Sequence, residues 1–142
     1  MIAPDYRGFG RSAPSDSPRC TMNDLAGDAI DLLDRLEITE AVVAGCSMGG
    51  YVALELIESA PRYAKGLVLI DTRAGADTED GKASRRRMLE TIDVGGSAAV
   101  ADEMTPKLLG DTTRRERPDL VEHIHHMIRS ANPAAIKTAV TA

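Results

Sequence analysis

In the first half of the chain, short continuous hydrophobic runs alternate with segments in which apolar residues recur at helical spacing. This pattern is typical of a sheet covered by helices. The runs at residues 41–44 and 66–70 are short and contain β-branched side chains, so each predicts a buried strand. Residues 51–57 have apolar side chains compatible with a helix largely covered by its neighbours. The apolar residues 1–3 indicate the tail end of another strand, which is stopped by Pro4.

An amphipathic helix is predicted before the first of these two runs. Thr21 with Asp24 three residues later is a capping-box-like start. The apolar residues that then recur at helical spacing are Leu25, Ala29, Leu32, Leu33 and Leu36. We expect this stripe to cover the sheet and the acidic residues opposite it to be solvated. Asp28 and Asp31 are too few ligands for a metal site.

From residue 75 onward the pattern predicts helices and loops. Residues 76–82 are a polar loop, and residues 82–92 carry the basic run Arg85–Arg87, which is more often a solvated helix face than an anion site. The glycine pair 95–96 breaks the chain, and a second helix is expected over residues 98–108.

Two further helices are expected near the end of the sequence. Pro118 opens the first, and Asn132 with Pro133 caps and starts the second. The first of these helices carries the histidines His123, His125 and His126. We expect surface or helix-packing histidines, because two imidazoles three residues apart make a weak metal site without a third ligand. No metal is therefore implied.

The junction between residues 44 and 51 carries the clearest chemistry. Gly45-Cys46-Ser47-Met48-Gly49 fits G-x-S-x-G between a strand and a helix, which defines a nucleophile elbow. So tight a turn forces Ser47 into a strained backbone conformation, and Gly45 and Gly49 avoid β-carbons that would clash. We predict Ser47 as the nucleophile and the N–H of Met48 as an oxyanion-hole donor. The serine still needs a base to take its proton.

This junction has two other interpretations. A glycine-rich turn can simply pack closely or bind an anion, but the strand before it and the helix after it favour the elbow. Cys46 could be a nucleophile, but the pattern centred on it has Ala44 and Met48 where glycines are needed. We expect Cys46 to be a small buried side chain instead.

A second glycine pattern, residues 8–13, formally fits the dinucleotide fingerprint G-x-G-x-x-A. That fingerprint needs a helix to open on its glycines. The following residues 14–18 are Pro-Ser-Asp-Ser-Pro, so no helix can begin there. The pattern favours a loop shaped for close packing over a nucleotide site.

The amino-acid composition limits the kinds of molecule that this protein is expected to bind. The 142 residues are 43% hydrophobic and 27% charged, as expected for one ordinary globular domain. A net charge of −5 and few aromatic residues argue against nucleic acid and anionic membranes as partners. Two cysteines are too few for a disulfide framework. Neither a secretory leader sequence nor a long apolar run is evident. We therefore expect a cytoplasmic location.

Three stretches together resemble the α/β-hydrolase superfamily, in particular its esterase, enol-lactonase and haloperoxidase-like branch. They are residues 3–12 (APDYRGFGRS), residues 45–50 (GCSMGG) and residues 67–73 (LVLIDTR). The resemblance implies a partial α/β-hydrolase fold, a parallel sheet flanked by helices, over residues 1–74. It implies a helical lid over residues 75–142. The similarity extends over essentially the whole chain but covers only the middle of that fold.

The resemblance implies a serine hydrolase that acts on a small ester or lactone and needs no cofactor. It places the second oxyanion donor upstream of Met1, and the catalytic acid and histidine beyond Ala142. The sequence is therefore similar to the central slice of an enzyme of about 250 residues. We expect this slice to be inactive by itself. Asp71 follows a predicted strand, where some subfamilies carry the acid, but a loop-stabilising carboxylate is favoured.

Two further expectations follow from the missing parts. The chain could be a catalytically silent hydrolase-fold module that binds a ligand or partner. In the family's sheet a strand lies between those that resemble residues 1–3 and 41–45, so its absence leaves unpaired edges. Such edges favour self-association.

Overall fold

The computed structural model describes residues 1–15 and 19–142, so residues 16–18 of the proline-rich stretch lie outside it. The chain forms two compact units. The first contains residues 1–4 and 19–76, together with Ala142. The second contains, among the described residues, the loop that begins at Asp5 and residues 77–141.

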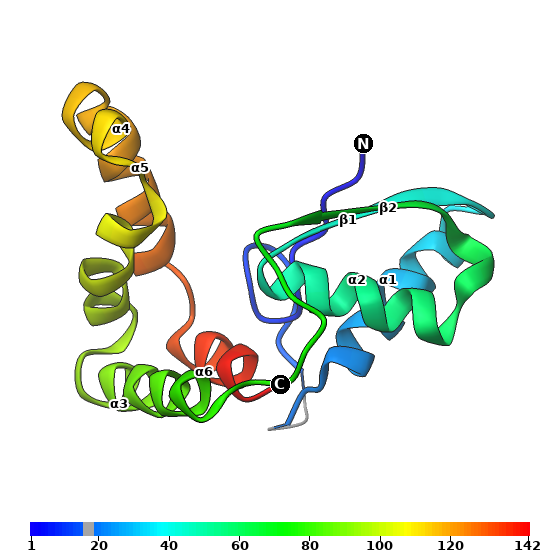
Figure 1. The fold of residues 1–142 in the computed structure, drawn as a ribbon, viewed down its shortest axis with the longest axis horizontal. Helices are drawn as coiled ribbons and strands as arrows, with labels where there is room; N and C mark the ends of the chain where they lie inside the picture. The colour runs from blue at the N-terminus through cyan, green and yellow to red at the C-terminus, as the bar shows by residue number, and fades with distance from the viewer. Residues whose placement is uncertain (16–18) are drawn as a thin grey trace. The chain divides into compact units, whose positions relative to one another are not determined.

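The first unit is built around a pair of parallel strands. β1 (Ala41–Cys46) leads through α2 (Met48–Ser59) and a short 3-10 turn, η1 (Pro61–Tyr63), into β2 (Ala64–Ile70). The register pairs Val43 with Leu67 and Cys46 with Ile70. Helix α1 (Met22–Arg35) packs on α2, and both helices lie on one side of the strands (Figure 1).

The core of this unit lies between α1 and α2 and beneath β1. Its buried side chains are Cys20, Leu25, Ala26, Val52, Ala53, Leu56, Ala60 and Tyr63. The prediction that residues 51–57 form a helix largely covered by its neighbours is confirmed. The capping box is also confirmed, because the Asp24 N–H donates to Thr21 Oγ1 (3.2 Å) and the Thr21 N–H donates to Asp24 Oδ2 (2.8 Å). Local sequence therefore determines where α1 begins.

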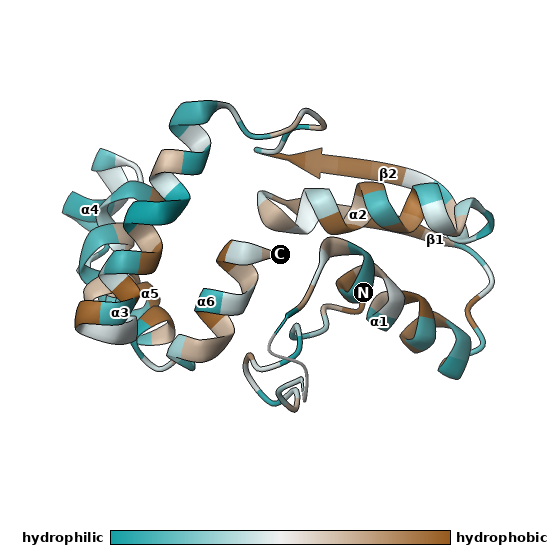
Figure 2. Ribbon diagram, turned by 90° about the horizontal axis from the view of Figure 1, so that it is seen from below, coloured by the Kyte–Doolittle hydropathy of each residue, from teal (hydrophilic) through white to brown (hydrophobic). Residues whose placement is uncertain are grey.

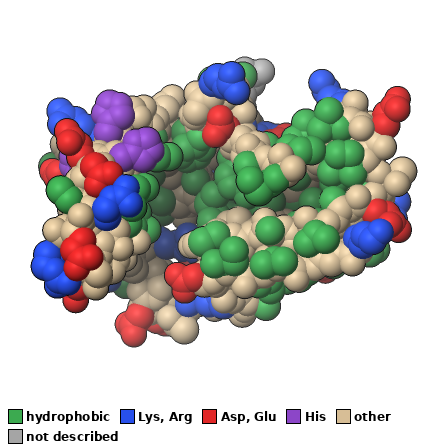
Figure 3. Space-filling model, turned by 90° about the horizontal axis from the view of Figure 1, so that it is seen from above, with side chains coloured by type: hydrophobic (Ala, Val, Ile, Leu, Met, Phe, Trp, Pro, Cys, Tyr) green, Lys and Arg blue, Asp and Glu red, His purple; other side chains and the backbone are tan. Residues whose placement is uncertain are grey.

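The prediction that both strands are buried is wrong. Val42 is 62% exposed, and Val68 and Ile70 are 44% and 51% exposed. Side chains alternate between the two faces of a sheet, and these residues occupy the face away from α2. Even Leu69, on the α2 side, is 44% exposed, because α2 packs mainly over β1. The strands are brown in the hydropathy colouring of Figure 2, and hydrophobic side chains cover this exposed face in Figure 3.

The prediction of a strand tail at residues 1–3 is also wrong, because these residues are not in a strand. A strand is stable only when its backbone groups pair with a neighbour, and within the described residues the sheet contains β1 and β2 alone. Met1 and Ile2 are accordingly exposed.

Self-association of the 142-residue chain through unpaired strand edges stays a prediction, and the exposed strand β2 makes it testable. We expect Val68→Lys to lower the fraction of oligomer in sedimentation velocity, because a lysine on an edge strand opposes pairing with a strand of another chain. Thr39→Lys, an exposed change of equal charge, is the matched control. A wild-type chain that is monomeric at tens of micromolar and melts cooperatively would contradict the prediction.

The second unit is helical. Helix α3 (Glu79–Leu108) packs against α5 (Pro118–Arg129) and α6 (Pro133–Thr141), and the short α4 (Asp111–Glu116) packs against α5. The expected break at residues 95–96 is confirmed as a kink within α3, at Gly96.

The bounds of these helices differ from the sequence-based prediction in two places and agree with it in two. The polar loop is shorter than predicted, because Thr78 caps α3 by accepting the Gly81 N–H at 3.2 Å. Helix α4 was not predicted. Pro118 does open α5, and the Asn132 side chain accepts the Ala134 N–H at 3.0 Å, which confirms it as the cap of α6.

The basic run on α3 is solvated only in part. Arg86 and Arg87 are exposed as expected, whereas Arg85 is half-buried and forms an ion pair with Asp77. Its Nη1 also donates to the Val140 carbonyl at 3.5 Å. Arg85 therefore joins the start of α3 to the end of α6, a contact between residues 55 positions apart.

The loop after Asp5 packs closely, and no helix opens on its glycines, as expected. Gly8 has a φ of +82°, and a β-carbon there would lie 2.9 Å from the β-carbon of Ala135 in α6. Gly10 has a φ of +51°. The Asp5 carboxylate accepts the Arg11 N–H at 3.2 Å and occupies the space beside Gly10.

Gly10→Ala is expected to lower the free energy of unfolding by about 1–2 kcal/mol, because alanine is strained at this positive φ and its β-carbon displaces the Asp5 carboxylate. Urea denaturation measures the change. Gly75→Ala is the control, since a β-carbon there meets nothing within 4 Å and its φ is ordinary. Equal stability of the two variants would show that the loop does not need glycine at position 10.

Across the part of the chain that is described, no helix is both long enough and apolar enough to cross a membrane. The same residues include no cluster of three or more His, Cys, Asp or Glu side chains arranged to hold a metal ion.

Candidate active site

Ser47 stands at the junction between β1 and α2 with a positive φ of 51° and a ψ of −117°, outside the regions that L-residues ordinarily adopt. Only a few per cent of non-glycine residues have a positive φ. The strained conformation that the sequence predicted for this serine is therefore confirmed. It turns the chain directly from the last residue of β1 into the first residue of α2.

The two outer glycines of the motif meet across this turn. A β-carbon on Gly45 would lie 2.1 Å from the Gly49 carbonyl oxygen and 2.6 Å from the Gly50 nitrogen. Both are backbone atoms, which cannot move aside as a flexible side chain can. The close approach expected for Gly45 and Gly49 is thus present, and Gly45 is buried.

The side chain of Ser47 is exposed at the start of α2. Ser47 occupies the N-cap position, yet its hydroxyl makes no capping bond to the helix. Serine at an N-cap usually accepts an N–H from the first turn. Met48 is the first residue of α2, where a backbone N–H has no partner within the helix. An oxygen that becomes negative near this N–H would be stabilised by it and by the helix dipole.

The end of β2 holds the backbone of Ser47. The Ser47 N–H donates to the Ile70 carbonyl at 3.0 Å, and the Thr72 hydroxyl donates to the Ser47 carbonyl at 2.8 Å. Sequence reasoning missed Thr72, because the two residues are 25 positions apart. It also gave no role to Gly50, the second of two consecutive glycines, although that repeated glycine was the available signal.

The expectation that Cys46 is buried is wrong. Its side chain is exposed, because it points to the sheet face away from α2, on the same face as Val42 and Val68. Cys46 is a free thiol beside Ser47 in sequence but on the strand itself, not at the turn.

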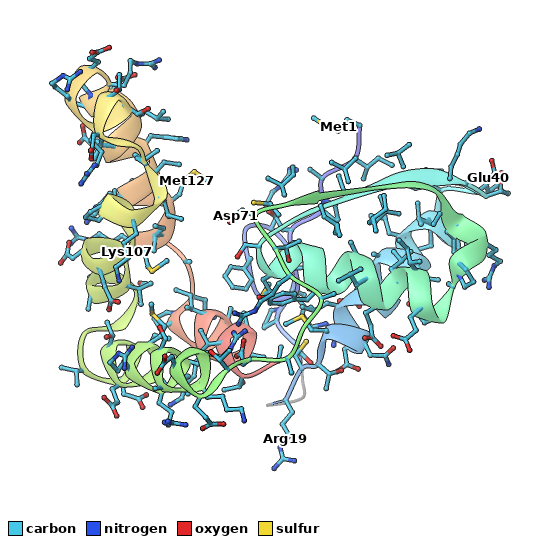
Figure 4. All side chains as sticks on the ribbon, in the orientation of Figure 1. Met1, Arg19, Glu40, Asp71, Lys107 and Met127 are labelled. Carbon is cyan, nitrogen blue, oxygen red and sulfur yellow. The ribbon has the colours of Figure 1, made fainter. Side chains whose placement is uncertain are left out.

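Asp71 is the first residue after β2, and it too has a positive φ, of 44°. Figure 4 shows Asp71 at the carboxyl end of the strands and Glu40 at the opposite end. Because Cys46 pairs with Ile70 at the last position of both strands, Ser47 and Asp71 are the residues that directly follow two neighbouring strands. The part played by the Asp71 carboxylate stays a hypothesis.

All three histidines belong to helix α5 of the second unit. His125 lies 2.8 Å from Asp102 of α3 through its Nε2, and His123 and His126 are exposed. This agrees with the expected surface or helix-packing histidines.

Shifted pKa values occur among residues of the second unit. Burial raises the pKa of Tyr6. The hydrogen bond from Lys107 lowers the pKa of Glu103, and the hydrogen bond from Arg117 lowers the pKa of Asp119. These two carboxylates lie on helices α3 and α5.

The fold and the elbow place this chain among the α/β-hydrolases. A sequence model of the alpha/beta hydrolase family matches residues 1–141, so the chain belongs to that family. The expected superfamily and fold class, with a parallel sheet flanked by helices, are confirmed.

Individual relatives agree with the family. A structure of a thermophilic esterase from Thermogutta terrifontis is 37% identical, with a TM-score of 0.89 over 97% of this chain and 51% of that chain. The enol-lactonase from Burkholderia xenovorans is 27% identical, with a TM-score of 0.80 over 97% of this chain and 53% of that chain. The 3-oxoadipate enol-lactonase 1 of Acinetobacter baylyi is 35% identical over 91 residues, or 63% of this chain and 33% of its own length. The chain thus spans about half the length of these solved relatives and a third of the last.

Proposed function

We propose that this chain carries the nucleophile of a serine hydrolase that acts on a small ester or lactone. One observation carries the proposal. Ser47 has a positive φ, an exposed side chain and no capping bond, at the first turn of the helix that follows a parallel strand. This combination matches the nucleophile elbow. The names of the similar esterase and enol-lactonases support the same class of substrate.

The chemistry follows from the position of the hydroxyl. Ser47 Oγ bonds to the carbonyl carbon of the substrate while a base takes its proton. The Met48 N–H donates to the carbonyl oxygen as that oxygen becomes negative. The ester or lactone C–O bond then breaks, and the alkoxide oxygen leaves with a proton. Water attacks the acyl carbon in the second half, releasing the acid and restoring the serine.

The base and the acid belong to the part of the fold that the resemblance places outside these 142 residues. We propose that residues 75–142 act as a lid that shapes the substrate pocket, as the resemblance implies. The exposed apolar side chains on its helices support that role, because Leu108 is 56% exposed and Met127 is 55% exposed.

The test is covalent labelling of the full-length gene product with a fluorophosphonate probe, followed by identification of the labelled peptide. We expect label on the peptide that contains Ser47, and slower labelling when a hydrolysable ester or lactone competes. A protein that takes up no label at Ser47 would refute the proposal and favour the catalytically silent module.

A further inference from the structure

We propose that Thr72 is a positioning residue for this hydrolase, because it fixes the peptide group that joins Ser47 to Met48. The inference rests on the proposed function and assigns a role to a residue outside the G-x-S-x-G motif. The contact that carries it is the hydrogen bond from the Thr72 hydroxyl to the Ser47 carbonyl, 2.8 Å long.

The backbone of Ser47 is strained, with a φ of 51°. A non-glycine residue persists at a positive φ only where its surroundings hold it there. Both peptide groups of Ser47 are held. Its N–H donates to the Ile70 carbonyl, and its carbonyl accepts the Thr72 hydroxyl and the Gly50 N–H, the last at 2.9 Å. One of these three bonds comes from the last residue of β2 and another from Thr72, two residues after it, so the neighbouring strand and its exit stabilise the shape of the elbow.

Thr72 occupies the space beside Gly50. A β-carbon on Gly50 would lie 2.3 Å from Thr72 Oγ1 and 2.6 Å from Thr72 Cβ. Contacts this short are sterically excluded, so position 50 must be glycine for Thr72 to reach the elbow. This accounts for the second of the two consecutive glycines, which the nucleophile motif alone does not require.

The hydrogen bond from Thr72 also bears on the predicted oxyanion donor, the N–H of Met48. The Ser47 carbonyl and the Met48 N–H belong to one planar, trans peptide group, so they point in opposite directions. A donor that holds the carbonyl therefore also sets the direction of the N–H. A hydrogen bond to the carbonyl further polarises the peptide and strengthens the N–H as a donor. Thr72 thus orients the predicted oxyanion donor without touching the substrate.

The test compares Thr72→Val with Thr72→Ser in the full-length gene product. Valine keeps the shape and loses the hydroxyl, whereas serine keeps the hydroxyl and loses the methyl group. With p-nitrophenyl butyrate as the probe substrate, we expect Thr72→Val to lower kcat about three- to tenfold, the effect of one hydrogen bond, and to leave KM within about twofold. A donor that acts in the transition state changes kcat and not ground-state binding. Thr72→Ser should retain kcat within about twofold.

Three results would overturn the inference. They are a kcat unchanged in Thr72→Val, an equal loss in Thr72→Ser, and a loss confined to KM. The far-ultraviolet circular dichroism and the urea midpoint of each variant identify a loss that comes from unfolding instead.

Failure of the proposed function would be recognised separately. If the wild-type protein neither takes up fluorophosphonate nor hydrolyses the ester, the hydrolase assignment fails. The structural role of Thr72 is then tested by amide hydrogen exchange at Ser47. Exchange at least about threefold faster in Thr72→Val than in Thr72→Ser supports the stabilisation of the Ser47 backbone by the Thr72 hydroxyl, and equal rates overturn it.

Discussion

Ser47→Ala is expected to abolish fluorophosphonate labelling of the full-length gene product and to lower ester hydrolysis by about 10⁴-fold or more. The loss follows because, in the proposed function, the hydroxyl is the group that bonds to the substrate. Stability should change by less than about 0.5 kcal/mol. Alanine keeps the β-carbon, so the strain at φ 51° is unchanged, and the lost hydroxyl makes no capping bond. In-gel labelling and a urea melt measure the two quantities.

Cys46→Ala is the matched control for that experiment. Cys46 is an exposed thiol and the immediate neighbour of Ser47, so it is the alternative nucleophile at this junction. Its side chain points to a sheet face and not out of the turn, and we expect Cys46→Ala to label at the wild-type rate. Label that survives Ser47→Ala and disappears in Cys46→Ala would assign the chemistry to the cysteine.

Gly45→Ala is expected to lower the free energy of unfolding by about 3 kcal/mol or more, a larger loss than Gly10→Ala causes. The added β-carbon would lie 2.1 Å from the Gly49 carbonyl oxygen and 2.4 Å from its carbon. Relief of that clash requires β1 and the first turn of α2 to move apart. We therefore expect labelling of Ser47 to fall together with the urea midpoint.

Gly27→Ala provides the control for a glycine inside the same unit. Gly27 lies within α1, and a β-carbon there meets nothing within 4 Å. Alanine in a helix interior is favoured over glycine by about 0.5–1 kcal/mol, so this variant should be slightly more stable than wild type. If Gly45→Ala is as stable as Gly27→Ala, the elbow is not as tight as its geometry indicates.

The features that the sequence predicted correctly are those encoded by neighbouring residues. Thr21 and Asp24 satisfy each other across one helical turn, and Asn132 caps α6 through the N–H two residues on. The kink at Gly96 likewise depends on a few adjacent residues, and so does the close approach of Gly45 to Gly49 at the elbow. In each case the hydrogen bonds and steric limits act within about four positions, so a local pattern contains them.

The tertiary structure decided which strand faces are covered and what holds the elbow. An apolar run such as residues 66–70 favours a strand, but its burial depends on which helix lies over it, and α2 lies mainly over β1. The bond from Thr72 to Ser47 joins residues 25 positions apart, so it exists only once two strands pair in register. The sequence by itself determined the helices other than α4, the tight turn at Ser47 and the family. Contacts between residues far apart in the sequence decided which sheet face is exposed and which residues stabilise the backbone of Ser47. Such contacts depend on the whole fold and not on local spacing.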